Sequence, residues 1–356
     1  MRAELRLGFD TRLRRYSPRG GCLLGSVAPQ YTRGVAVTDK LRAPGGESLK
    51  IGLFLLVILM IPGFIASSIG GQAASMAVGI AAGSGLALGS VLDLRRSVGL
   101  VVLLGVVAAA GVLAAGQPIA AALVVAAVTA FTGLTNGWSA GSYALAPVLA
   151  IVFAATDRGL PWWSAAAWSI AGGLIGLVVL RLMKVDSEPS PMSERHAWRH
   201  AIALAAACGV TLWAALAWEL PQGYWIPVTL LVALRPLPEE RSDILADRLW
   251  GTVIGAVVAL VAAFLLPPSL TQLVALVFLG LVAGYGVARN YLMQTACLTP
   301  MLMLFATAGD DLRTFEFTAQ RVLFTILGVI IGAAVITALA IWDARDTEDG
   351  AAVLEG

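Results

Sequence analysis

Apolar residues dominate the chain from about residue 51 onward, in runs long enough to cross a bilayer. A transmembrane helix needs about 20 mostly apolar residues to cross about 30 Å of hydrocarbon with its backbone amides bonded internally. Polar breaks define twelve runs, at residues 51–67, 72–92, 97–115, 117–135, 138–156, 161–183, 199–219, 223–236, 247–266, 269–287, 290–308 and 319–342. This pattern predicts an all-α polytopic membrane protein with about twelve transmembrane helices.

Composition also indicates that lipid is the main solvent of this chain. Hydrophobic residues make up 58% of the sequence and charged residues 13%, whereas soluble domains average about 45–50% apolar and about 25% charged residues. The net charge of +2 gives no indication of a nucleic-acid partner. Three scattered cysteines are too few for a disulfide framework or a metal cluster. We therefore expect no metal and no cofactor.

Basic residues are distributed unevenly between the two ends of the predicted helices. If the N-terminus is cytoplasmic and the helices alternate in direction, 21 of the 24 Lys and Arg residues fall on the cytoplasmic side. The exceptions are Arg158, Arg313 and Arg321. Because cytoplasmic loops are enriched in Lys and Arg, both termini are predicted to be cytoplasmic.

Several residues of the first half recur in the second half at a nearly constant offset. The matching pairs, 152 to 156 residues apart, are Arg96 and Arg248, Gly99 and Gly251, Pro147 and Pro300, Gly172 and Gly328, and Gly176 and Gly332. Because each copy has six predicted helices, both copies enter the membrane in the same direction and form parallel repeats. In transporters built from repeats, the substrate site lies at the repeat interface, so we expect the route between the two halves.

This organisation divides the chain into five segments. They are a basic flexible cytoplasmic arm (1–49), a divergent first six-helix repeat (50–183), a cytoplasmic linker (184–198), a second six-helix repeat (199–342) and an acidic cytoplasmic tail (343–356).

The second repeat carries an ordered set of motifs. They are Gly223-Tyr-Trp-Ile-Pro-Val-Thr229, Leu-Arg235-Pro236, Arg248-Leu-Trp-Gly251-Thr252-Val-Ile-Gly255, Leu298-Thr-Pro300, and Arg321 followed by Gly328 and Gly332. This order resembles the fusaric acid resistance and aromatic acid exporter family of integral membrane transporters. The resemblance is good over residues 199–342 and faint over 51–185, where Gln72, Ala73 and Ser75 replace the Tyr-Trp-x-Pro element.

The resemblance implies a secondary transporter in a bacterial plasma (inner) membrane. Members of this family export aromatic carboxylic acids or related hydrophobic organic anions, with the proton gradient as the expected driving force. The expected partners are a small organic anion, the lipid bilayer and, in a homo-oligomer, further copies of the chain; nucleic acid is not expected. Two alternatives stay open: an anion channel or uptake route for small aromatic compounds, and a non-transporting membrane scaffold.

Candidate substrate-binding residues combine aromatic faces, hydroxyl and amide groups, prolines within spans, and guanidinium groups that grip a carboxylate with two hydrogen bonds. They are Tyr224, Trp225, Pro227, Thr229, Arg235, Arg248, Gln294, Thr299, Pro300 and Arg321. A proline within a span, at Pro147 as well, frees a backbone carbonyl that protein or a watery cavity must cover. The structural alternatives are local threonine bonds, packing prolines and arginines at the headgroups. For Arg321, on the disfavoured outer side, function is the favoured interpretation.

Other chemistry has few candidates in this sequence. Glu219, just before Pro221, is the one proton-coupling candidate that we name. There is no P-loop, dinucleotide fingerprint or nucleophile elbow, so we expect neither an ATP-driven pump nor an enzyme. Three glycine pairs, each four residues apart, are predicted to let helices approach closely: Gly172 with Gly176, Gly251 with Gly255, and Gly328 with Gly332.

Overall fold

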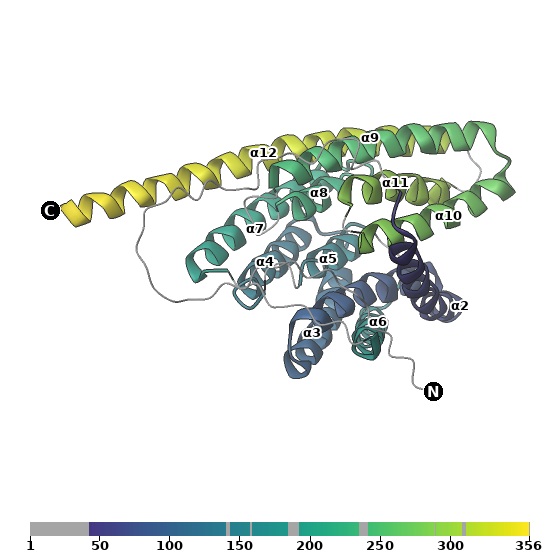
Figure 1. Cartoon of the computed structure of the whole chain (residues 1–356), viewed down its shortest axis with the longest axis horizontal. Helices are drawn as coiled ribbons and strands as arrows, with labels where there is room; N and C mark the ends of the chain where they lie inside the picture. Colours follow the sequence, from purple (N-terminus) through teal and green to yellow (C-terminus); the bar gives the residue numbers. More distant parts are fainter. Residues whose placement is uncertain are drawn as a thin grey trace.

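A computed structural model of the chain describes residues 43–139, 143–156, 159–183, 192–234, 241–288, 290–307 and 311–355. Regular structure within these residues is entirely helical (Figure 1). The helices are α2 (Gly46–Val91), α3 (Leu94–Ala114), α4 (Pro118–Thr135), α5 (Ala146–Ala155), α6 (Trp162–Met183), α7 (Glu194–Ala217), α8 (Trp225–Ala233), α9 (Arg241–Leu265), α10 (Pro268–Val287), α11 (Tyr291–Thr307) and α12 (Asp311–Glu355). Most of the predicted arm and linker, and the candidate residue Arg235, lie outside the described residues.

Helix α2 consists of two helical segments that fold back on each other at Gly71. Gly71 has a φ of 75°, a left-handed conformation that glycine adopts without a steric penalty. A Cβ at Gly63 would lie 3.4 Å from the Oγ atom of Ser75. In a straight helix these positions would be about 18 Å apart. The predicted runs at 51–67 and 72–92 are therefore separate helical segments.

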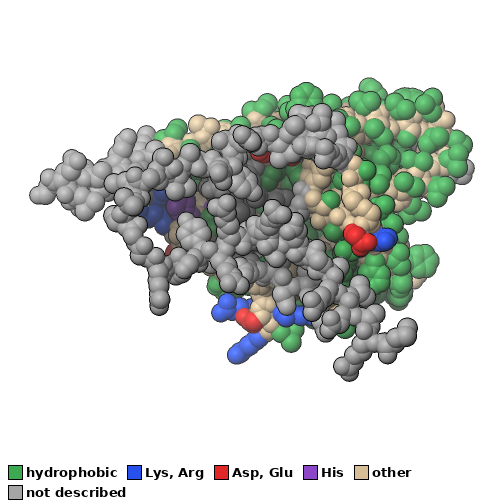
Figure 2. All heavy atoms as spheres, in the orientation of Figure 1, with side chains coloured by type: hydrophobic (Ala, Val, Ile, Leu, Met, Phe, Trp, Pro, Cys, Tyr) green, Lys and Arg blue, Asp and Glu red, His purple; other side chains and the backbone are tan. Residues whose placement is uncertain are grey.

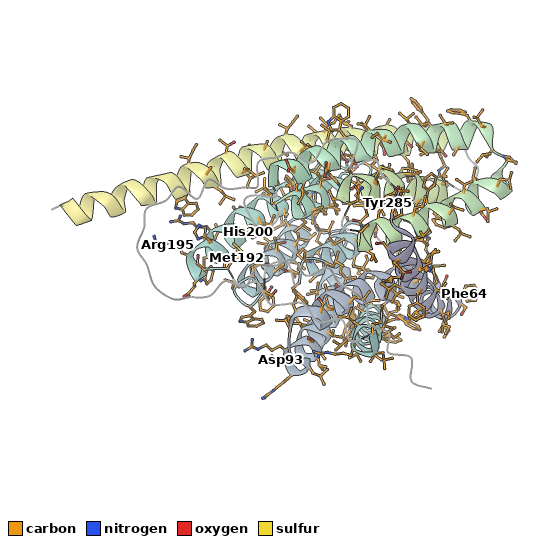
Figure 3. All side chains as sticks on the ribbon, in the orientation of Figure 1. Phe64, Asp93, Met192, Arg195, His200 and Tyr285 are labelled. Carbon is orange, nitrogen blue, oxygen red and sulfur yellow. The ribbon has the colours of Figure 1, made fainter. Side chains whose placement is uncertain are left out.

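Eight helices in the described part of the chain are long and apolar enough to cross a membrane. Their outward faces carry large apolar side chains such as Phe64, which is 75% exposed and lies at the edge of α2 (Figure 3). Figure 2 shows mainly hydrophobic side chains over α9 and α10. Such surfaces are stable in lipid, so the chain is a polytopic helical membrane protein.

Three of the predicted runs form helices too short to meet that criterion. Helices α5 and α8 have 10 and 9 residues, and α11 has 17. Nine helical residues extend about 13 Å, less than half of a hydrocarbon layer. Twelve full crossings therefore stay a prediction.

Glycines bring helices of the same half into direct contact, as their spacing predicted. In the first half, Gly172 of α6 lies against the backbone of Val78 in α2, at a distance that excludes a Cβ. In the second half, a Cβ at Gly251 of α9 would lie 2.7 Å from the carbonyl oxygen of Leu292 in α11. The absence of side chains at these positions lets backbones pack against each other.

The two halves contact each other through an apolar core, which offers no polar surface to the expected route in this region. The core combines Val107, Ala121, Val125, Ala150 and Ile151 with Leu204, Cys208, Leu212, Val228 and Leu231. Interdigitated aliphatic side chains offer no hydrogen-bond donor to an anion. In the described residues, the buried cationic groups lie instead within the second half.

Candidate functional site

Arg321 belongs to a polar stripe on α12 that faces the protein interior. Thr314, Thr318, Arg321 and Thr325 recur at intervals of four, three and four residues, which places them on one helix face. All four side chains are buried, and Arg321 has 0% exposure. Ile330, on an outward-facing position of the same helix, is apolar and exposed. Helix α12 thus combines a lipid-facing apolar side with an inner side of hydroxyl and guanidinium groups.

The guanidinium group of Arg321 lies over the indole ring of Trp225, at the start of α8. Its Cζ atom is 3.8 Å from the ring centre, within the range of a cation–π interaction. Its Nε, Nη1 and Nη2 atoms are all buried and have no hydrogen-bond partner among the residues that the structure describes. Because a guanidinium keeps its charge in proteins, burial without a partner is unfavourable. An anion is the ligand that would satisfy this group.

Arg248 of α9 contributes a second buried guanidinium group. It is 3% exposed, its Nη1 donates a hydrogen bond of 3.5 Å to the hydroxyl of Tyr291, and its Nε is buried without a partner. Arg248, Tyr224 and Tyr291 interact electrostatically with Arg321. No described carboxylate forms an ion pair with either arginine. Two positive charges therefore share a buried region that holds no negative partner from the described part of the chain.

Threonine hydroxyls lie on the four helices that carry the two arginines, Trp225 and Tyr291. The Oγ1 atoms of Thr229, Thr252, Thr295 and Thr318 are buried without a hydrogen-bond partner in the described structure. A Cβ at Gly328 would lie 2.7 Å from the Cβ of Thr229, so α8 packs directly against α12 at this level. Each hydroxyl can donate one hydrogen bond and accept others. These buried hydroxyl groups form no hydrogen bonds with the described residues, so they are available to a ligand.

Thr299 and Pro300 lie where α11 packs against Gly255 of α9. Thr299 donates a hydrogen bond of 3.2 Å to the carbonyl of Thr295, the local bond common for threonine in helices. Pro300 lacks the N–H that would bond to the carbonyl of Ala296, and that oxygen lies 2.5 Å from the Cβ position of Gly255. Helix α9 therefore covers the freed carbonyl, and both residues make packing contacts.

Pro227 and Pro147 begin helices, so the predicted interruptions at these positions are wrong. Helix α8 starts at Trp225, which puts Pro227 in its first turn, and Pro147 is the second residue of α5. N–H groups in a first turn have no acceptor within the helix. Neither proline therefore removes a helical hydrogen bond or frees a carbonyl.

The remaining candidates have different surroundings. The ring of Tyr224 is centred 5.2 Å from that of Trp225, at an interplanar angle of 36°. Gln294 faces α10, because its Nε2 lies 3.0 Å from the Cβ position of Gly286. Glu219 is exposed in the turn between α7 and α8. The structure therefore brings Tyr224 into the arginine site and leaves Gln294 and Glu219 elsewhere.

Sequence reasoning did not identify Gln222 or Tyr291 as site residues. Gln222 accepts a hydrogen bond of 3.3 Å from the Nε1 atom of Trp225, and its own Nε2 is buried without a partner. Tyr291 is the acceptor for Arg248. Gln222 directly precedes the Gly-Tyr-Trp element, which is the signal that could have found it. For Tyr291, at the start of α11, no local pattern points to the site.

Comparison with known proteins supports a relationship for the second half. Residues 205–338 match the model of a family described as fusaric acid resistance protein-like. The match begins in α7 and ends in α12, so it includes Trp225, Arg248 and Arg321. Comparison with curated proteins and with solved structures finds no match. Over residues 205–338, the chain is therefore similar to the fusaric acid resistance protein-like family.

Proposed function

We propose that this protein is a secondary transporter that exports aromatic carboxylic acids, or related amphipathic anions, across a bacterial plasma membrane. The observation that carries the proposal is the buried guanidinium of Arg321, which lies over Trp225 and has no hydrogen-bond partner in the described structure. The family match over residues 205–338 supports a membrane transporter of the resistance type. In this proposal the protein performs no covalent chemistry and acts by binding and releasing its substrate.

The groups around Arg321 suit both parts of an aromatic acid. A guanidinium holds a carboxylate through two parallel hydrogen bonds, and Trp225 and Tyr224 offer faces on which an aromatic ring can pack. The hydroxyls of Thr229 and Thr318 add hydrogen-bonding groups. Arg248 adds a second positive charge that raises the local concentration of anions. A neutral aromatic compound would leave both charges unpaired.

Contacts between the halves support the proposed arrangement of twelve spans in two parallel repeats. Gly52 of α2 packs against Gly284 of α10, and Gly133 of α4 packs against Ala201 of α7. If the two halves are exchanged with an offset of 152 residues, Gly52 corresponds to position 204 and Gly284 to position 132. A contact between positions 204 and 132 is close in sequence to the observed contact between Ala201 and Gly133. Such reciprocity is expected for copies related by an axis along the membrane normal. An even number of spans in each copy would leave both termini cytoplasmic.

The repeats differ at the proposed site. At the 156-residue offset that relates Gly172 to Gly328, the counterpart of Arg321 is Ala165, which is buried. Arg96, the counterpart of Arg248, is exposed and pairs with Asp93 at 3.2 Å. We therefore place anion binding in the second repeat alone, with the first repeat as its structural support.

Transport by the purified protein in liposomes tests this proposal. We expect saturable uptake of labelled benzoate, accelerated by a pH gradient, and a loss of about tenfold or more in Arg321→Gln, because the bidentate charge-assisted contact is removed. Arg321→Lys should recover only part, because lysine offers a point charge without the planar fork. Arg96→Gln, which changes an exposed arginine, is the matched control. Absence of flux for benzoate and a panel of related acids would overturn the proposal.

The threonine stripe of α12 favours an anion channel as the second candidate. Thr314, Thr318 and Thr325 continue the polar face along the helix on both sides of Arg321. A continuous line of hydroxyl groups suits passive permeation as well as a carrier. A voltage-clamped bilayer separates the two, since a channel gives unit conductance steps and a carrier gives saturable flux without them.

A further inference from the structure

We propose that Arg321 and Arg248 hold a chloride ion in the resting protein, and that the organic substrate displaces it. The inference rests on the proposed anion site. It adds the ligand that neutralises the site between transport cycles.

Two buried positive charges at the site favour a bound anion. Arg321 is 0% exposed and Arg248 is 3% exposed, the two charges interact, and neither forms an ion pair in the described structure. Arginine does not relieve burial by losing its proton, as lysine does. The repulsion between two buried like charges adds to the desolvation of each. A bound anion removes both penalties, so we expect the resting state to contain one.

The unpartnered hydrogen-bonding atoms around the two arginines are mainly donors. Three nitrogens of Arg321, Nε of Arg248 and Nε2 of Gln222 are buried donors without an acceptor. The hydroxyls of Thr229 and Thr318 can donate as well. No unpartnered carboxylate or ring nitrogen is buried among the described side chains. A cluster of donors of this kind is complementary to an anion and not to a cation.

The surrounding helices are in close contact, which favours a small anion. A Cβ at Gly328 would lie 2.7 Å from Thr229, and one at Gly251 would lie 2.8 Å from Thr295. Helices α8 and α12, and helices α9 and α11, therefore touch at the levels where the unpartnered hydroxyls lie. A monatomic anion needs less separation of these helices than an aromatic ring does. Chloride is the abundant anion of this size and is easier to dehydrate than phosphate or sulfate.

A shared site would couple the binding of substrate to the release of chloride. Substrate can enter the site only when chloride leaves, because both need the same guanidinium groups. We therefore expect exchange of an organic anion for chloride to be faster than net movement of either anion. Chloride should also compete with substrate at the side from which the substrate binds.

Thermal unfolding of the purified full-length protein tests chloride binding. At constant ionic strength, replacing sodium gluconate with sodium chloride should raise the Tm of the wild type saturably, by about 5 °C at about 150 mM chloride, since a ligand that binds only the folded state stabilises it. Arg321→Met and Arg248→Met should remove or reduce the chloride-dependent increase. Arg96→Met is the matched control and should keep it. A wild-type Tm that does not respond to chloride would overturn the inference.

A second measurement does not depend on whether the variants fold. Wild-type protein should bind radiolabelled chloride saturably, and benzoate should displace it. In liposomes loaded with labelled chloride, external benzoate should accelerate chloride release. Benzoate flux that neither needs nor releases chloride overturns the inference and leaves the proposed function intact. Chloride binding that depends on both arginines, without flux of any organic acid, overturns the proposed function and leaves the chloride site intact.

Discussion

The indole nitrogen of Trp225 lies 3.3 Å from the side-chain oxygen of Gln222 and fixes the direction of the Gln222 amide. Because an indole N–H only donates, the Oε1 atom of Gln222 is the acceptor and its Nε2 is left as a buried donor. Gln222 also has a φ of 60°, a backbone conformation that is uncommon for a residue with a Cβ. We therefore expect Gln222 to hold the ring of Trp225 in its position under Arg321.

We predict that Gln222→Leu weakens substrate binding more than it reduces the maximal rate. The change removes the acceptor for Trp225 and the free Nε2 donor, so the KM for benzoate should rise about 5–10-fold, equivalent to about 1 kcal/mol of binding. Gln72→Leu, at an exposed position of α2, is the matched control. An unchanged KM in Gln222→Leu, with unchanged thermal stability, would remove Gln222 from the site.

Replacement of Trp225 separates its aromatic contribution from its hydrogen bond. Trp225→Phe keeps a ring under Arg321 but loses the N–H, whereas Trp225→Ala loses both. The expected loss in affinity for benzoate is therefore larger for alanine, by about 1–2 kcal/mol, the range of a desolvated cation–π contact. Trp250→Ala, on the exposed side of α9, is the control. Equal effects of phenylalanine and alanine would show that the ring does not contribute.

Several features of the fold were accessible from hydropathy and spacing alone. The apolar runs located the long helices, because only a helix satisfies its own backbone in lipid. The glycine pairs located close helix contacts, as Gly172 against Val78 shows. Arg321 stood out because a basic residue on the outer side opposes the usual charge bias.

Other features could not be predicted, for identifiable physical reasons. Apolar composition does not distinguish a long helix from a loop followed by a short helix. For this reason the predicted runs did not show that α5 and α8 are short, with Pro147 and Pro227 in their first turns. Lipid and neighbouring helices both favour aliphatic side chains, so the sequence did not reveal that the contact between the halves is an apolar core. The polar face formed by Thr318, Arg321 and Thr325 was not predicted, because its inward direction depends on tertiary packing.

Gly255 should tolerate no side chain. A Cβ there would lie 2.5 Å from the carbonyl oxygen of Ala296 and 2.8 Å from the Cβ of Thr299. Since α9 and α11 would have to separate, we expect Gly255→Ala to destabilise the protein by about 1–3 kcal/mol, as other overpacking changes do. Gly99→Ala is the matched control, because nothing lies within 4 Å of its Cβ position and alanine favours the helix. Comparable Tm values for the two variants would contradict the close contact.

His200 connects three helices at the end of the bundle where α7 begins, as Figure 3 shows by its place on that helix. Its Nε2 lies 2.7 Å from the carbonyl oxygen of Leu234, just after α8, and its Nδ1 lies 3.4 Å from the Nδ2 of Asn136, just after α4. A carbonyl only accepts, so Nε2 carries the proton, and Nδ1 of the neutral ring accepts from the Asn136 amide. The ring thereby joins the two halves through a pair of directional bonds.

We therefore predict that His200→Ala lowers the free energy of unfolding by about 2–4 kcal/mol, since it removes the donor to Leu234 and opens a gap in a buried contact. His196→Ala, one turn earlier on α7, changes an exposed histidine whose ring hydrogen-bonds to Ser193, and should leave the Tm nearly unchanged. Denaturation of both variants in the same detergent is the measurement. If His200→Ala were as stable as His196→Ala, the bonds to Leu234 and Asn136 would not hold the halves together, and the apolar core between them would have to do so alone.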